Sequence, residues 1–316
     1  MVRSPNTRGL RIAAPAATLF ILLAAVAGPV AAHHPGGSWG TAVSAESPPG
    51  TSSELNTSFN DGCPIEGPDG RTLYTATTRP GAVGGGGIDI WVATRPNTSA
   101  PFGAPVPLPA PINSPADDFC PTPIIGGGLF FVSSRAVPGA CGLPPTGDIY
   151  FAWNRPGAGW TEPRNLGCQA DGGPNSALGE AGPSYFFARG HGMLYFSSGP
   201  DIYQSVQRWN GSFGPATPVA ELNDPVAGDF RPNVRLDGLE VVFDSNRLGS
   251  FGFQDIYVAT RARTSDPWST PANLGLNINT AAGSETRASF SLFANRLYVG
   301  RTPGPEGGTD IFVSTR

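Results

Sequence analysis

Lysine is absent from this chain of 316 residues, and histidine and methionine occur only three times and twice. All 20 basic residues are therefore arginines, and 24 acidic residues outnumber them, so the formal net charge is −4. The arginines form no long basic run. Because nucleic-acid-binding proteins carry clustered positive charge, this composition argues against nucleic acid as a partner.

Motifs for metal chemistry are also missing. The four cysteines show no CxxC spacing, and the three histidines are too few for most metal sites. The sequence has no HExxH zinc motif and no phosphate-binding loop. We therefore predict no metal and no other cofactor, and no catalytic residue is assigned on motifs alone.

Glycine and proline, in contrast, are abundant, with 43 and 34 copies. Glycine destabilises helix interiors and proline interrupts them, so long helices are excluded and turn-rich β structure is favoured. The 39% of hydrophobic residues is enough to form a core.

The first 32 residues are typical of a secretory signal. Three arginines precede an apolar run that ends in small residues, and cleavage is predicted after Ala32. Removing the three arginines changes the formal net charge from −4 to −7. We predict residues 33–316 to form one domain that is secreted or periplasmic, without stable membrane insertion.

One motif occurs five times: an Asp-Ile-aromatic triplet that is followed a few residues later by an arginine. The copies are IDIWVATR (88–95), GDIYFAWNR (147–155), PDIYQSVQR (200–208), QDIYVATR (254–261) and TDIFVSTR (309–316). Each copy ends a unit with four short β-rich runs, and turns such as Asp237-Gly238 separate them. Four strands per unit, at a period above 50 residues, predict a β-propeller with five four-stranded blades.

The outer strand of each blade predicts how the ring closes. Its pattern is an aromatic residue followed by small residues and proline: PFGAPVPL (101–108), GWTEPRNL (159–166), SFGPATPV (212–219) and PWSTPANL (267–274). A degenerate copy, SWGTAVSA (38–45), lies near the N-terminus, whereas the last unit has no outer strand. The N-terminal segment should therefore complete the C-terminal blade and leave no free edge.

The units share an order of features: a proline, an Asp-Gly turn, a strand that ends in arginine, and then Asp-Ile-Tyr. This order resembles the TolB-type, WD-repeat-like β-propeller repeat of secreted bacterial proteins. The resemblance covers residues 38–316 and implies the propeller fold. Such repeats occur in scaffolds, peptidase domains and polysaccharide-active enzymes, so it does not imply one activity.

Two sets of charged residues should lie on one face, where each inner strand begins. Acids open the inner strands, and arginines end the second strands of four units. These are Asp61, Asp118, Glu180, Asp229 and Glu285, with Arg79, Arg135, Arg247 and Arg301. Because they follow the repeat, we interpret them as structural ion pairs. If the chain is an enzyme, Asp61, Glu180 and Glu285 are its candidate acids.

The third unit departs from the repeat, and it suggests a ligand site. Its sequence SSGPDIY leaves almost no loop between the second and third strands, whereas the second unit has its longest loop there. A notch beside blade 3 is therefore predicted, with Glu180, Tyr185 and Arg231 as ligand-binding residues.

The four cysteines are disulfide candidates in an exported protein. Cys63 and Cys120 occupy equivalent positions in adjacent units, and Cys141 and Cys168 both belong to the second unit. We favour the pairs Cys63–Cys120 and Cys141–Cys168. The alternative joins Cys120 to Cys141 and Cys63 to Cys168.

Two functions remain open on the sequence. The favoured one is a monomeric, non-catalytic propeller that binds a protein or glycan partner on its loop-rich face. The alternative is a polysaccharide-active enzyme, a glycoside hydrolase or lyase, with carboxylates around the central pore.

Overall fold

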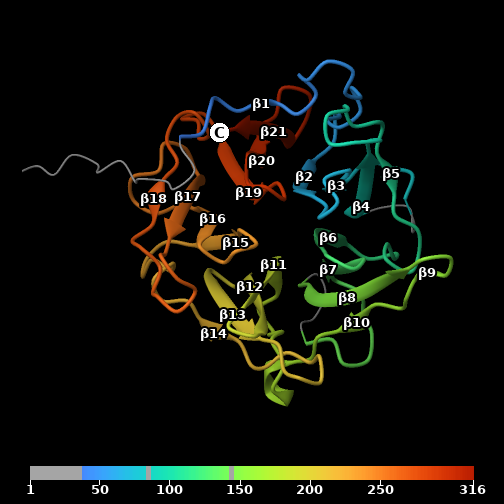
Figure 1. The fold of residues 1–316 in the computed structure, drawn as a ribbon, viewed down its shortest axis with the longest axis vertical. Helices are drawn as coiled ribbons and strands as arrows, with labels where there is room; N and C mark the ends of the chain where they lie inside the picture. The colour runs from blue at the N-terminus through green and yellow to red at the C-terminus, as the bar shows by residue number, and fades with distance from the viewer. Residues whose placement is uncertain (1–37, 83–86, 142–145) are drawn as a thin grey trace, which may run out of the picture. The chain divides into compact units, whose positions relative to one another are not determined.

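The computed structural model describes residues 38–82, 87–141 and 146–316, and the proposed signal segment lies outside these ranges. Five small antiparallel sheets are arranged in a ring, which confirms the predicted all-β, five-bladed propeller (Figure 1). The described residues contain one short 3-10 turn, Gln169–Asp171, and no α-helix. They contain no helix long and apolar enough to cross a membrane.

Each blade runs from an inner strand at the ring's centre to an outer strand. Blade 1 contains β2 (Asp61–Glu66), β3 (Thr72–Thr77), β4 (Asp89–Thr94) and β5 (Val106–Pro107). Blade 2 contains β6 (Asp118–Ile124), β7 (Gly128–Ser133), β8 (Asp148–Arg155) and β10 (Arg164–Asn165), and β9 (Gly159–Trp160) pairs with the end of β8. Blade 3 contains β11 (Glu180–Ala188), β12 (His191–Ser198), β13 (Asp201–Val206) and β14 (Thr217–Pro218). Blade 4 contains β15 (Asp229–Val234), β16 (Glu240–Ser245), β17 (Asp255–Thr260) and β18 (Ala272–Asn273).

Blade 5 is built from both ends of the described chain. It contains β19 (Ser284–Phe290), β20 (Arg296–Thr302), β21 (Asp310–Thr315) and the N-terminal strand β1 (Val43–Ser44). Val43 pairs with Val313 and Ser44 with Phe312, so β1 lies beside β21 (Figure 1). The predicted closure is confirmed, and the edge of β21 is covered.

The hydrophobic core lies at the seams, the contact surfaces between neighbouring blades. At the seam of blades 3 and 4, Phe186 and Tyr195 pack with Val241, Phe243 and Trp268. All five side chains are buried. A single blade has two apolar faces, so each blade depends on both neighbours for burial.

Every inner strand carries a β-bulge near the axis of the ring. The residue two positions after the opening acid has a φ between 47° and 59° in all five blades: Cys63, Cys120, Gly182, Arg231 and Arg287. The register shifts at the same place in each blade. A bulge bends the strand and redirects its side chains, so these five residues come together around the axis.

Two disulfides are present, and they confirm the favoured pairing. Cys63 is bonded to Cys120 with 5.0 Å between their Cα atoms, and Cys141 to Cys168 with 5.3 Å. The alternative pairing is therefore wrong. The first bond joins two bulges of adjacent blades, because equivalent residues approach each other at the axis.

Candidate active site on the loop-rich face

The loop-rich face is the face on which the inner strands begin, and carboxylates line it in pairs. The backbone N–H of each opening acid donates to the carbonyl just before the Asp-Ile-aromatic triplet of the preceding blade. The N···O distances are 2.7–2.8 Å for Asp61 to Thr309, Asp118 to Ile88, Glu180 to Gly147, Asp229 to Pro200 and Glu285 to Gln254. Each seam therefore places an opening acid beside the aspartate that starts the neighbour's third strand.

In four of these five pairs an arginine forms an ion pair with the opening acid. The ion pairs are Arg79–Asp61, Arg135–Asp118, Arg247–Asp229 and Arg301–Glu285. The four acids are fully buried. Asp61 and Glu285, two of the candidate acids, thus each accept a hydrogen bond from an arginine of their own blade.

The fifth pair, Asp148 and Glu180, has no arginine among the described residues. Pro200 follows Ser198 at the position where an arginine follows the equivalent serine in blades 2 and 4. Instead, the Ser176 N–H and the Ser198 hydroxyl donate to Oε1 of Glu180 at 2.8 and 3.0 Å. Oε2 of Glu180 and Oδ1 of Asp148 are buried without a hydrogen-bond partner in the described part of the chain.

The surroundings of Glu180 favour its protonated form. Burial, with a smaller contribution from the nearby Asp148 carboxylate, raises the pKa of Glu180 to about 7 against the opposing hydrogen bonds from Ser176 and Ser198. The other oxygen of Asp148, Oδ2, accepts hydrogen bonds from the Cys141 N–H and from the Asn165 side-chain amide, both at 2.7 Å. The seam of blades 2 and 3 thus holds two neighbouring carboxyls in different environments, which is typical of acid–base pairs.

This pKa has a consequence for stability, which a glutamine variant tests. The folded chain holds the Glu180 proton above the ordinary value of 4.5, so stability falls as pH rises from about 4.5 to beyond 7. The total loss is about 3 kcal/mol. Glu180→Gln keeps the shape without the ionisation. We expect its melting temperature to match wild type at pH 4 and to exceed it at pH 8, by calorimetry. Parallel curves for the two proteins would contradict the raised pKa.

The residues predicted to bind a ligand lie in three different surroundings. Glu180 begins β11 on the loop-rich face, and Tyr185 lies five residues further along the strand, in a cavity with Phe130 and Phe213. Arg231 lies at the axis, where its guanidinium is paired with Asp244.

The axis itself is nearly filled. The Cys63–Cys120 disulfide, Arg231 and Arg287 line a cavity of about 30 Å³, enough for little more than one water molecule. Nε of Arg287 is buried without a hydrogen-bond partner among the described residues. Burial and the neighbouring Arg231 lower the pKa of Arg287 to about 10. The axis therefore has no room for a ligand as large as a sugar ring.

Sequence reasoning missed Asp148 and Arg287. The aspartate looked like part of the repeat, although the missing arginine of the third unit was visible in the sequence. Within the described ranges, no group of three His, Cys, Asp or Glu side chains is placed to hold a metal ion.

Comparison with solved structures finds propellers of similar architecture, whereas the chain matches no model of a known protein family and no curated protein. A structure from the GH130 family of mannoside phosphorylases, which contains hydrolases that target β-1,2-mannosidic linkages in Candida mannan, aligns with a TM-score of 0.55 at 9% identity, covering 87% of this chain and 94% of that one. A thermostable family-43 glycoside hydrolase aligns with a TM-score of 0.53 at 13% identity, covering 84% of this chain and 91% of that one. The GH43 endo-arabinanase from Bacillus licheniformis aligns with a TM-score of 0.51 at 14% identity, covering 81% of this chain and 93% of that one.

These matches correct the favoured functional interpretation. The matching structures are glycoside hydrolases, so the prediction of a non-catalytic binding propeller is contradicted and is not retained. At 9–14% identity the likeness shows the fold of this chain only.

Proposed function

We propose that the chain is a glycoside hydrolase acting on polysaccharides, with Glu180 as general acid and Asp148 as the paired carboxylate. One observation carries the proposal: of the five carboxylate pairs on the loop-rich face, this is the pair without an arginine among the described residues. A neighbouring arginine favours the ionised form of an acid, whereas Glu180 has no such partner among the described residues and its pKa is raised to about 7.

The chemistry follows the two-carboxylate mechanism of glycoside hydrolysis. Glu180 gives its proton to the glycosidic oxygen as the bond to the anomeric carbon breaks. Asp148 accepts a proton from the water that adds to that carbon, and exchange with solvent returns both groups to their starting states. The loop 176–179 wraps the Glu180 carboxyl, since Ser176 donates to it, and Glu180 is only 3% exposed. Substrate binding therefore requires this loop to open.

Digestion of soluble arabinan, xylan and mannan by the purified protein tests the proposal. We expect reducing sugar to be released from at least one polymer, with kcat falling as pH rises through about 7 because Glu180 must be protonated. Glu180→Gln should lower kcat by about 10²–10⁴-fold. Glu221→Gln, at an exposed glutamate, is the matched control and should keep full activity. No release from any polymer, or release unchanged in Glu180→Gln, would overturn the assignment.

We further propose that the repeats are of the TolB type and that the protein is exported as a monomer after cleavage at Ala32. The two disulfides support export, because such bonds persist in oxidising compartments. N-terminal sequencing of the exported protein should begin at His33, and gel filtration should give the mass of one chain.

A further inference from the structure

Three seams contain an arginine placed six residues after the aspartate of the Asp-Ile-aromatic triplet. Arg95, Arg261 and Arg316 occupy this position in blades 1, 4 and 5. Each guanidinium lies over an outer-strand aromatic ring, at 4.3 Å from Phe102, 4.0 Å from Trp268 and 4.4 Å from Trp39. Each Nε also donates to a backbone carbonyl at 2.7–2.8 Å.

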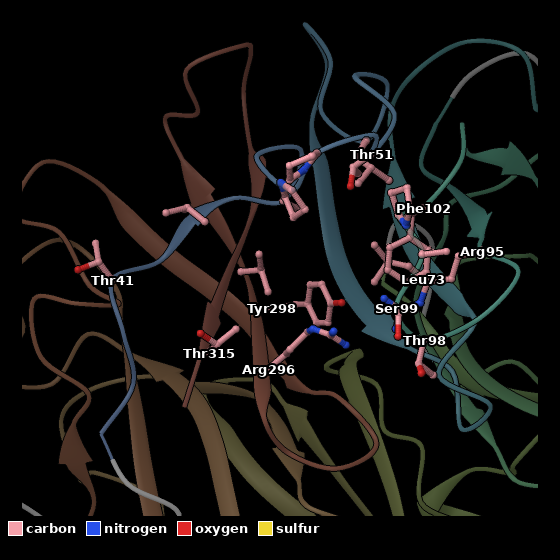
Figure 2. A pocket seen from close by; sticks show the side chains of 18 residues that line it. Thr41, Thr51, Leu73, Arg95, Thr98, Ser99, Phe102, Arg296, Tyr298 and Thr315 are labelled. Carbon is pink, nitrogen blue, oxygen red and sulfur yellow. The ribbon is translucent and has the colours of Figure 1, made fainter.

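The seam of blades 5 and 1 illustrates this arrangement. Arg95 and Phe102 lie on one side of a cavity of about 340 Å³, and Tyr298 and Arg296 of blade 5 face them (Figure 2). Glu66 accepts from Arg95 at 3.1 Å and from the Tyr298 hydroxyl at 3.0 Å. Charged and strongly hydrogen-bonded groups thus form much of the floor of this seam.

Blades 2 and 3 carry one extra residue in the same segment. Asn154 and Gln207 occupy the position of these arginines, and the arginines of blades 2 and 3 follow one residue later, at Arg155 and Arg208. Because side chains alternate along a strand, the shift turns the arginines away, and both are exposed. Arg208 instead donates to the Gly172 carbonyl at 3.1 Å.

Aromatic side chains fill the seam of blades 2 and 3 in place of the guanidinium. Phe130 stacks on Tyr185 at 5.2 Å and contacts Phe151 at 4.6 Å, and Phe151 contacts Trp153 at 4.9 Å between ring centres. These rings and Phe213 line a cavity of about 530 Å³, which we call the aromatic groove. Trp153 stands at its rim with 41% of its surface exposed.

A few polar groups accompany the rings. The Tyr185 hydroxyl donates to Gln207 at 2.9 Å, and the exposed Glu162 and Arg164 line the same cavity with opposite charges. The groove thus has a large apolar floor, an amide, a hydroxyl and no net charge. Its volume lies in the range of small-ligand sites.

We propose that the aromatic groove binds a segment of a neutral polysaccharide, separately from the Asp148–Glu180 pair. A neutral sugar ring offers an apolar C–H face to stack on the aromatic rings, and hydroxyls for Gln207, Glu162 and Arg164. The cancelling charges disfavour an anionic polymer. The ligand class rests on the proposed function, whereas the existence of the site rests on the aromatic rings that line the cavity and on the exposed Trp153 at its rim.

The groove and the carboxyl pair belong to one seam. Five residues of β11 separate Glu180 from Tyr185, about 16 Å at the usual rise of a strand. A long polymer can contact both places, whereas a short oligosaccharide reaches only one. The groove should therefore lower KM for polymers and leave kcat on short substrates unchanged.

Two variants test the groove by affinity electrophoresis in gels containing arabinan, xylan or mannan. Gln207→Arg introduces, at the position it has in blades 1, 4 and 5, a guanidinium that would cover the rings of the groove, and Trp153→Ala removes the exposed ring. We expect wild type to be retarded by at least one polymer and each variant to bind it about tenfold more weakly. Phe253→Ala, at an exposed ring of blade 4, is the matched control and should bind as wild type does.

The outcomes separate this inference from the proposed function. Glu180→Gln should bind the polymer normally while losing hydrolysis, and Gln207→Arg should hydrolyse short substrates normally while losing polymer binding. Wild type that is retarded by none of the polymers, or retardation unchanged in both Gln207→Arg and Trp153→Ala, would overturn the groove. Retardation by polygalacturonate instead would replace the neutral ligand with an acidic one and overturn the proposal as stated. Melting temperatures near that of wild type show that the variants fold.

Discussion

Removing residues 38–45 is expected to lower the free energy of unfolding by more than about 5 kcal/mol, because the segment supplies both a strand and a buried ring. Gly40 and Ala45 donate backbone hydrogen bonds to Thr315 and Ile311 at 2.9 and 3.0 Å, on either side of β1. Trp39 is 3% exposed and packs under Arg316 and beside Phe290. Loss of a buried tryptophan side chain alone costs about 3–5 kcal/mol.

Urea denaturation and size-exclusion chromatography measure this effect. The deletion leaves β21 with an open edge, so the shortened chain should also self-associate. A synthetic peptide of residues 38–46, added in trans, should restore much of the lost stability, and the same peptide with Trp39→Ala should not. A deletion with the wild-type unfolding midpoint would show that the last blade does not need its fourth strand.

The features that could be predicted from the sequence are those that the repeat imposes. Ring closure followed from an outer-strand pattern at 38–45 that precedes the first unit. The Cys63–Cys120 bond followed from equivalent positions in adjacent units, because rotation about one axis brings equivalent inner residues together. Periodicity fixes such contacts without knowledge of any individual side chain.

The features that could not be predicted depend on side-chain direction. The bulge of β15 turns Arg231 to the axis and to Asp244, away from the notch where the sequence placed it with Glu180 and Tyr185. Periodicity gives no sign of a one-residue irregularity inside a strand. The aromatic groove, in contrast, had a visible signal, because the segments GDIYFAWNR and PDIYQSVQR are one residue longer than their three siblings.

Arg247→Ala is expected to destabilise the propeller by about 3–5 kcal/mol, because it leaves a buried carboxylate without its charge partner. Asp229 is fully buried and paired with Arg247, which also donates to the Leu222 carbonyl at 2.6 Å. The guanidinium lies 5.1 Å from the rings of both Phe243 and Tyr257, so packing is lost as well. Arg155→Ala, at an exposed arginine, is the control and should change stability by less than about 0.5 kcal/mol.

A second substitution separates the buried charge from the lost packing. In Arg247→Ala the Asp229 carboxylate stays buried without its charge partner. Arg247→Ala combined with Asp229→Asn carries no such charge. The double variant should therefore be more stable than Arg247→Ala at pH 7, by calorimetry. Equal stability of the two at pH 7 would mean that packing against Phe243 and Tyr257, and not the ion pair, is the main contribution of Arg247 to the blade.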